Sequence, residues 1–229
     1  MENKESVLSL LRVCTQRDKD NEYVINSKNK EIMSNEQALQ EMVSHELNAR
    51  TRRGVFYSFT TDLELAKAYK RRNPENTEIC SIDIDLANLP ATVKSIFPIY
   101  SRDYLMSLIC STPEMLQKEK VQNPETGRDH SFLGILNTSQ RTVSGWANSM
   151  KEIVLQADNL QLHVLDENSF VPQDEATVDR IVRKYLFPQV SLDNVKKFRD
   201  IIESEFNKAG CKRRYLLDRV NGDEWAKVA

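Results

Sequence analysis

The chain has 229 residues, of which 40% are hydrophobic and 29% are charged, a composition typical of folded globular proteins. Its 34 acidic and 32 basic residues leave a formal charge of −2, which excludes a globally basic nucleic-acid-binding protein but leaves local basic patches open. No apolar run approaches the roughly 20 residues that a membrane helix needs, and no secretory leader precedes the first predicted strand. We therefore expect a cytosolic protein of one large or two small domains, with no membrane partner.

The cysteines are widely scattered, with neither a Cys-x-x-Cys pair nor a histidine at metal-ligand spacing. They are Cys14, Cys80, Cys110 and Cys211. This pattern indicates neither a disulfide framework nor a zinc site, so we expect reduced, buried thiols and no metal.

The first predicted element is a buried strand at residues 7–14, where leucines and β-branched residues form a short apolar run. Arg12 is unusual inside such a strand, because a charge there needs a partner. Residues 35–47 have apolar side chains at helical spacing, which predicts a helix. A turn closed by Gly54 follows and carries a basic cluster, Arg50, Arg52 and Arg53.

A strand, a helix and a second strand are predicted next. The strand begins at Val55, and Thr61 with Glu64 forms a capping box for a helix over residues 62–72. The inner face of that helix holds Leu63, Ala66 and Tyr69. Residues 78–86 alternate between apolar and polar side chains, which predicts a half-buried strand. Its apolar side holds Cys80, Ile82, Ile84 and Leu86.

Turn and hairpin signals occupy the middle of the chain. Residues 123–129 contain Pro and Gly, which predicts a turn or mobile loop. Two strands are predicted at residues 151–156 and 160–165, and the short linker between them favours an antiparallel hairpin. Glu152 opens the first of these strands.

Helix signals dominate the C-terminal part of the chain. An apolar stripe recurs at helical spacing over residues 192–206, with Ser191 as N-cap and Gly210 as terminator. The stripe consists of Leu192, Val195, Phe198, Ile202 and Phe206. We therefore predict an α+β domain over residues 1–168 and a helical appendage over residues 169–229.

Four features follow one another in a fixed order along the first domain. They are Arg12 in a strand, a strand ending in Tyr-Ser-Phe-Thr-Thr at residues 57–61, a capped helix starting Asp-Leu-Glu-Leu-Ala-Lys-Ala-Tyr at residues 62–69, and a late strand opening with Glu152. This order resembles the ADP-ribosyltransferase superfamily in its Arg-Ser-Glu branch, over roughly residues 7–165. The middle segment is the most specific part of the match. The His-Tyr-Glu branch is disfavoured, because the earliest histidine is His45.

The resemblance implies a split antiparallel β-sandwich with flanking helices, which binds NAD in a cleft between its two sheets. It also implies a mono-ADP-ribosyltransferase, which breaks the bond between nicotinamide and ribose and passes ADP-ribose to a macromolecule. NAD would then be a co-substrate.

Three residues match the catalytic positions of the family. Glu152 matches the carboxylate that stabilises the cation developing on the ribose. Arg12 matches the arginine that meets the pyrophosphate, since a guanidinium can donate two parallel hydrogen bonds to it. From the residues alone, Arg12 is equally an ion-paired structural residue, and Arg17 is a competing candidate. Ser58 has a hydroxyl suited to holding the catalytic carboxylate in place.

Neighbouring side chains are further candidates for binding NAD. Thr60 and Thr61 add hydroxyls where the strand meets a helix, although Thr61 is better suited to a cap. Aromatic rings offer surfaces for stacking nicotinamide, but core packing is their more common role, and Tyr69 is the strongest candidate among them. These rings are Phe56, Tyr57, Phe59 and Tyr69.

The acceptor is indicated by the segment before Glu152. Arginine-modifying members have Glu or Gln two positions before the catalytic Glu, where this chain has Met150, so arginine is not the expected target. The preceding loop faces the acceptor in the family and here holds Arg141, Trp146 and Asn148, which suit a phosphate, a base face and a base edge. A nucleic acid, RNA or DNA, is therefore slightly favoured over protein. A second basic cluster agrees with this choice: Lys208, Lys212, Arg213 and Arg214.

Several alternatives stay open. Trp146 is equally a buried loop anchor, and the basic clusters are equally solvated faces. If water is the acceptor, the chain is an NAD glycohydrolase, and if the cleft is degenerate, it is a non-catalytic interaction module. By analogy with intracellular members, the expected setting is a bacterial toxin–antitoxin or phage-defence system, with an antitoxin or inhibitor protein as a further partner.

Overall fold

The computed structural model describes residues 5–28, 31–47, 55–72, 77–137, 147–149, 151–209, 214–222 and 224–228. They form an α+β protein, as predicted, in two compact units that each combine three separate stretches of chain.

The two units have interleaved boundaries. Unit 1 comprises Met1–Ile32, Arg53–Pro98 and Met150–Leu186. Unit 2 comprises Met33–Arg52, Ile99–Ser149 and Phe187–Ala229. These boundaries differ from the predicted division after residue 168, because long-range packing groups the early helix of residues 35–47 with the helices that follow residue 186.

Unit 1 is built on a six-stranded antiparallel sheet with the order β10-β4-β1-β3-β8-β5. Its strands are β1 (Val7–Cys14), β3 (Tyr57–Thr60), β4 (Glu78–Asp85), β5 (Val93–Phe97), β8 (Glu152–Ala157) and β10 (His163–Val164). A separate two-stranded sheet pairs β2 (Val24–Ile25) with β9 (Leu160–Gln161). The strands predicted at residues 7–14 and 78–86 are confirmed.

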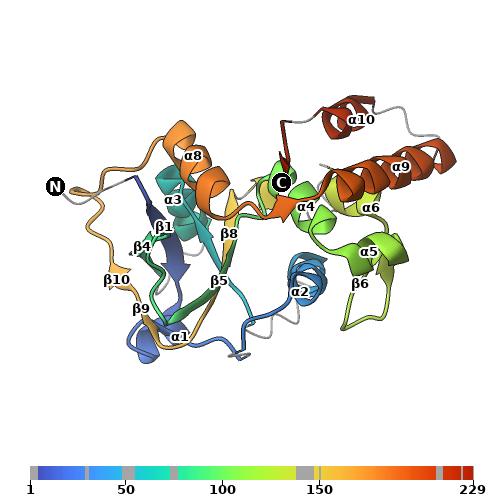
Figure 1. Cartoon of the computed structure of the whole chain (residues 1–229). Coiled ribbons are helices and arrows are strands. Elements are labelled where there is room, and N and C mark those ends of the chain that lie inside the picture. The colour runs from blue at the N-terminus through green and yellow to red at the C-terminus, as the bar shows by residue number, and fades with distance from the viewer. Residues whose placement is uncertain are drawn as a thin grey trace. The chain divides into compact units, whose positions relative to one another are not determined.

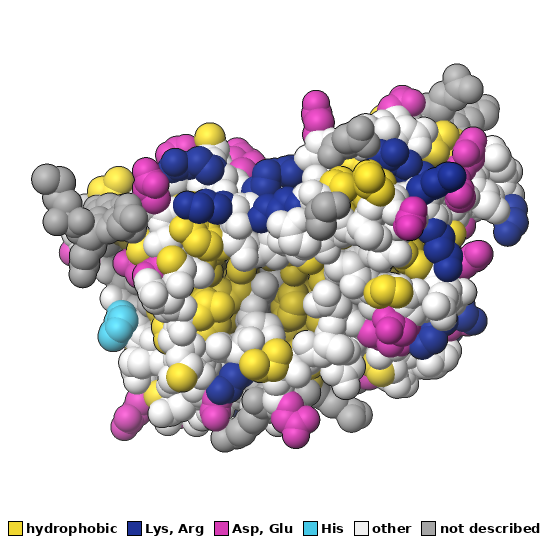
Figure 2. All heavy atoms as spheres, viewed as in Figure 1, with side chains coloured by type: hydrophobic (Ala, Val, Ile, Leu, Met, Phe, Trp, Pro, Cys, Tyr) yellow, Lys and Arg dark blue, Asp and Glu magenta, His cyan; other side chains and the backbone are white. Residues whose placement is uncertain are grey.

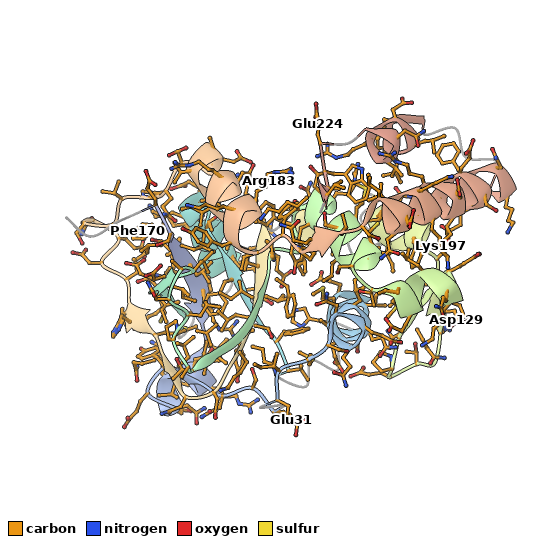
Figure 3. The ribbon with its side chains drawn as sticks, viewed as in Figure 1. Glu31, Asp129, Phe170, Arg183, Lys197 and Glu224 are labelled. Atoms are coloured by element: carbon orange, nitrogen blue, oxygen red, sulfur yellow. The ribbon has the colours of Figure 1, made fainter. Side chains whose placement is uncertain are left out.

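The helices of unit 1 are α1 (Gln16–Asp20), α3 (Leu63–Arg72) and α8 (Glu175–Tyr185). Figure 1 shows α3 beside the sheet, where it packs on β1 and β4. The contact buries apolar side chains of both layers, and Phe170 (labelled in Figure 3) packs against them. These side chains are Leu11, Leu63, Ala66 and Ile79. They hold the helix on one defined face of the sheet.

The N-terminus of α3 differs from the prediction. Helix α3 begins at Leu63, and the Oδ1 atom of Asp62 accepts hydrogen bonds from the backbone N–H groups of Glu64 (2.9 Å) and Leu65 (3.1 Å). The predicted capping box of Thr61 and Glu64 is wrong, because the chain turns one residue later and places Asp62 at the cap. Tyr69 is 43% exposed, so it does not share the buried face of Leu63 and Ala66.

The predicted hairpin of residues 151–165 is also wrong. Strand β8 lies between β3 and β5, whereas residues 160–165 divide into β9, which pairs with β2, and β10, which pairs with β4. A short linker favours a hairpin locally, but alternation specifies the buried face of a strand and not its neighbour.

Unit 2 is organised around α4 (Arg102–Cys110), which is buried from Asp103 to Cys110. The helices that pack on it are α2 (Asn35–Leu47), α5 (Pro113–Lys118), α6 (Phe132–Leu136) and α9 (Leu192–Lys208). The remaining elements are α10 (Arg214–Asn221), β6 (Val121–Gln122), β7 (Asp129–His130), β11 (Gln189–Val190) and β12 (Lys227–Val228). Strands β6 and β7 pair around the turn predicted at residues 123–129.

The predicted apolar stripe of α9 is largely confirmed. Ser191 caps the helix by accepting a hydrogen bond from the N–H of Asn194, and the stripe is buried except for Leu192, which is 66% exposed. Leu192 is the first residue of α9, and no neighbouring element among the described residues covers its side chain there.

The cysteines of the described residues are reduced thiols. Cys14, Cys80 and Cys110 are buried and free, and Cys211 lies outside the described residues.

In the described part of the chain, every helix is too short or too polar to cross a bilayer. Figure 2 shows basic and acidic side chains interspersed over the face in view, in keeping with the nearly balanced charge.

Candidate functional site

In the sheet of unit 1, the pairing between β1 and β3 is short. Among the described residues these strands pair only at Leu11 opposite Thr60, whereas β1 pairs with β4 along its whole length. At the residues of β1 before Leu11, the side-chain amide of Gln173 supplies hydrogen bonds that a neighbouring strand would otherwise make. It accepts from the N–H of Ser9 (2.9 Å) and donates to the carbonyl of Val7 (2.8 Å). After the Leu11–Thr60 pair, the Arg12 side chain connects β1 to β3.

Arg12 reaches from β1 to β3. Its Nη1 donates to the carbonyl of Ser58 (3.0 Å), and its Cζ lies 5.2 Å from the ring centre of Tyr57 and 6.0 Å from that of Phe59. Its Nη2 lies 3.8 Å from Oδ1 of Asp18. The Nε atom is buried and has no hydrogen-bond partner among the described residues. A buried donor without a partner is rare, so the local packing around Arg12 does not by itself account for its Nε.

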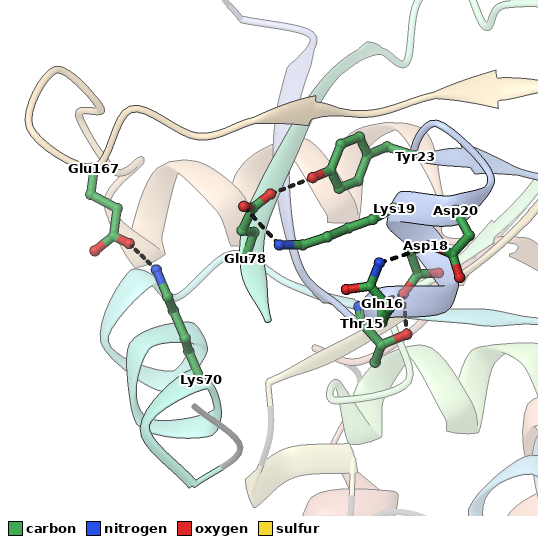
Figure 4. A network of polar contacts seen from close by, with 9 residues as sticks. All are labelled: Thr15, Gln16, Asp18, Lys19, Asp20, Tyr23, Lys70, Glu78 and Glu167. Carbon is green, nitrogen blue, oxygen red and sulfur yellow. Dashed lines mark hydrogen bonds and ion pairs between the residues drawn. The ribbon is translucent and has the colours of Figure 1, made fainter. Parts of the chain in front are cut away.

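Asp18 is held near Arg12 by the N-terminus of α1. The Oδ2 atom of Asp18 accepts from the N–H (2.7 Å) and the hydroxyl (3.0 Å) of Thr15. Figure 4 shows the neighbouring network, in which Lys19 (2.8 Å) and the hydroxyl of Tyr23 both donate to Glu78 of β4. Lys19 and Tyr23 lower the pKa of Glu78, and the bond to this carboxylate raises the pKa of Tyr23 to about 12. These bonds join α1 and the turn that follows it to β4.

Ser58, Thr60 and Glu152 share one face of the sheet. Thr60 is paired with Glu152, and Ser58 with Val154, and paired residues project to the same side of an antiparallel sheet. Because Thr60 is also paired with Leu11, this is the face on which α3 packs. Glu152 is only 6% exposed. The predicted serine and carboxylate therefore lie diagonally across neighbouring strands, on the same face of the sheet.

Arg12 projects from the opposite face of the sheet, since it follows Leu11 directly in β1. Its guanidinium donates a hydrogen bond to the backbone carbonyl of Ser58 in β3, and not to the Ser58 hydroxyl. The structure thus brings Ser58 and Glu152 together on one face, and it brings Arg12 to the same strand from the other side. Arg17 is exposed on α1.

The aromatic candidates have identifiable contacts. Tyr57 and Phe59 flank the guanidinium of Arg12, Phe59 is only 3% exposed, and the Tyr57 hydroxyl donates to the carbonyl of Asn26 (2.8 Å). Phe56 is buried edge-on against Phe97. Phe56 and Phe59 therefore have the role of core residues. Tyr57 instead lies against the guanidinium of Arg12.

Two further charged residues lie beside the site: Asp62, which the sequence placed at the start of the capped helix, and Lys151, which it did not single out. The Nζ of Lys151 lies 3.3 Å from Oδ2 of Asp62. Burial alone would raise the pKa of Asp62, but the backbone N–H of Leu65 and the Lys151 ammonium lower it overall. An Asp directly before a helix is a typical N-cap, and that signal was available at Asp62. No local pattern pointed to Lys151.

Most of the predicted acceptor residues cannot be placed. Asn148 is exposed in unit 2, and Lys208 is exposed at the end of α9. The residues outside the described part of the chain are Arg50, Arg52, Arg53, Arg141, Trp146, Met150, Lys212 and Arg213, and the side chain of Arg214 is also not described. The acceptor site stays a prediction.

Within either unit, the described residues bring no three metal-ligating side chains together.

Comparisons with family models, with curated proteins and with solved structures find no match to this chain.

Proposed function

We propose that the protein is a mono-ADP-ribosyltransferase, which cleaves the nicotinamide–ribose bond of NAD and transfers ADP-ribose to a macromolecule. One observation carries the proposal: Ser58 and the buried Glu152 share a face on adjoining strands, next to the single residue pair that joins β1 to β3. The family resemblance in the sequence names the same residues, and the six-stranded sheet is joined by one residue pair between β1 and β3.

The chemistry divides among these side chains. The Glu152 carboxylate stabilises the positive charge that develops on the ribose as nicotinamide leaves, and a low exposure strengthens that interaction. Ser58 orients the carboxylate from the neighbouring strand. Arg12 binds the pyrophosphate through Nη2, because the contact of Nη2 with Asp18 is long (3.8 Å), whereas Nη1 donates to the Ser58 carbonyl (3.0 Å).

The proposed acceptor is a nucleic acid in preference to a protein. Support for this choice comes from the sequence of the loop before β8, where Arg141, Trp146 and Asn148 suit a nucleotide and Met150 replaces the acidic or amide residue of arginine-modifying enzymes. The toxin or defence setting is likewise a proposal from the resemblance.

The test is nicotinamide release from NAD by the wild-type chain and by Glu152→Gln. We expect Glu152→Gln to lower the rate by about 10²- to 10³-fold, the usual effect of losing a preorganised charge-stabilising group. Glu203→Gln, an exposed residue of α9, is the matched control and should retain wild-type activity. Equal release by wild type and Glu152→Gln would refute the catalytic role of Glu152, and release by neither would refute the enzymatic activity.

The acceptor is identified with NAD labelled in its adenylate part and incubated with total cell lysate. Label that nuclease removes and protease leaves indicates a nucleic acid, and the reverse indicates a protein. Free ADP-ribose without a labelled macromolecule indicates an NAD glycohydrolase.

A further inference from the structure

Lys151, the residue directly before Glu152, has a left-handed backbone conformation with φ of 44°. This conformation is uncommon for a residue other than glycine, and it persists where surrounding contacts hold it. Because Lys151 directly precedes β8, its backbone conformation sets the direction from which the chain enters the strand. The contacts of Lys151 therefore bear directly on where Glu152 lies.

The Lys151 side chain contacts two carboxylates of unit 1. Its Nζ lies 3.3 Å from Oδ2 of Asp62 and 3.6 Å from Oε2 of Glu175. The Asp62 side chain is 27% exposed, whereas that of Glu175 is 73% exposed. Solvent weakens the contact with Glu175 more strongly, so Asp62 is the principal partner.

Asp62 is itself fixed on several sides. One carboxylate oxygen caps α3 through the N–H groups of Glu64 and Leu65, and the other faces Lys151. The backbone N–H of Asp62 donates to Oγ1 of Thr60 (3.1 Å), and Thr60 is paired with Glu152. A closed path thus runs from Thr60 through Asp62 and Lys151 to Glu152.

We infer that the Lys151–Asp62 ion pair is a positioning element for Glu152. It ties the start of β8 to the turn between β3 and α3, and so keeps the Glu152 carboxylate on the face of Ser58. Neither Lys151 nor Asp62 touches the substrate in this role. The inference rests on the proposed function, because it assigns Glu152 a catalytic task.

The test uses variants of the full chain that remove the ion pair and spare the fold. Asp62→Asn keeps a good N-cap for α3, since Asn and Asp cap helices about equally well, but it removes the charge. Lys151→Met removes the ammonium and keeps the length of the side chain, and Lys151→Arg restores the charge. Lys70→Met is the matched control, because it breaks another ion pair of α3, with Glu167 at 2.9 Å.

We expect Asp62→Asn and Lys151→Met each to lower kcat for nicotinamide release by roughly 10- to 100-fold, the effect of a small displacement of a catalytic group, with an unchanged KM for NAD. The double variant should be no slower than either single variant, because both remove the same interaction. Lys151→Arg should recover most of the rate, and Lys70→Met should match wild type. An unchanged kcat, additive losses or a change confined to KM would overturn the inference.

Hydrogen exchange at the amides of residues 151–153, measured without NAD, separates this inference from the proposed function. Faster exchange in Asp62→Asn than in Lys70→Met is expected, and equal exchange overturns the inference whatever the activity. If exchange changes as expected but wild type and Glu152→Gln are equally inactive, the proposed function fails and the ion pair is structural only.

Discussion

The guanidinium of Arg12 has a defined contact at two of its three nitrogen atoms. Nη1 binds the Ser58 carbonyl and Nη2 faces Asp18, while the aromatic rings of Tyr57 and Phe59 flank the group. Ion pairing with Asp18 is the structural role that the sequence left open for Arg12. The unpartnered Nε is the part of the side chain that this role does not explain.

Replacing Arg12 by Lys keeps the charge but removes the planar set of donors. We expect Arg12→Lys to weaken NAD binding by about 10- to 100-fold, because a hydrogen bond to a charged group contributes roughly 1.5–3 kcal/mol. Calorimetric titration with NAD measures this change. Arg17→Lys on exposed α1 is the control, and a loss of affinity there but not in Arg12→Lys would reverse the assignment.

The cap of α3 provides a second test with single residues. Removing an N-cap side chain typically costs about 1 kcal/mol, so Asp62→Ala should lower the free energy of unfolding by about that amount. Thr61→Ala should change it by less than about 0.5 kcal/mol, because the Thr61 side chain does not cap the helix. Urea unfolding of the two variants decides between the predicted and the observed cap.

The lowered pKa of Asp62 also makes stability depend on pH. A carboxyl group whose pKa is lower in the folded state stabilises the fold above its ordinary pKa of 3.8, where both states are ionised. That stabilisation is lost as the pH falls through the lowered value. The difference in unfolding free energy between wild type and Asp62→Asn should therefore be constant near neutral pH and shrink below about pH 4. Urea titrations over this range measure it, and a difference that grows on acidification would contradict the lowered pKa.

At the scale of elements, helix α9 shows what a periodic pattern predicts well. Its apolar spacing identified Phe198, which is fully buried and contacts the rings of Phe132 and Trp225. The same spacing included Leu192, which is 66% exposed. The pattern identifies a face of the helix, but the length over which that face is covered depends on the neighbouring elements.

Substitutions on this stripe should therefore differ sharply. We expect Phe198→Ala to lower the free energy of unfolding by about 3–5 kcal/mol, because it leaves a cavity in the core of unit 2. Leu192→Ala should change it by less than about 0.5 kcal/mol. Chemical denaturation followed by circular dichroism measures both, and similar losses would contradict the observed burial.

At the scale of the whole molecule, the C-terminal helices are divided between the units. Helix α8 belongs to unit 1, where it packs on β1, and α9 belongs to unit 2, where it packs on α4, α5 and α6. Residues 169–229 therefore supply part of the core of both units and are not a separate layer.

Truncation after residue 168 tests this organisation. The fragment loses the buried side chains of α9, so we expect it to bind a hydrophobic dye and to lose cooperative thermal unfolding. The intact chain is the reference. A fragment with the melting temperature of the intact chain would instead support the appendage that the sequence predicted.

The sequence by itself determined most elements and the face that each one buries. The alternation of β1 and β4, the apolar spacing of α2 and α9 and the Ser191 cap are local patterns, and local patterns can be read along the chain. It also identified Arg12, Ser58 and Glu152 as candidates through the resemblance.

Only the tertiary structure decided which elements are neighbours. It placed β8 between β3 and β5, joined β1 to β3 by a single residue pair, put Glu152 on the face opposite to that of Arg12, and joined Lys151 to Asp62. Strand pairing and ion pairs between distant residues depend on the packing of the whole unit, and the alternation within one strand carries no information about its partner.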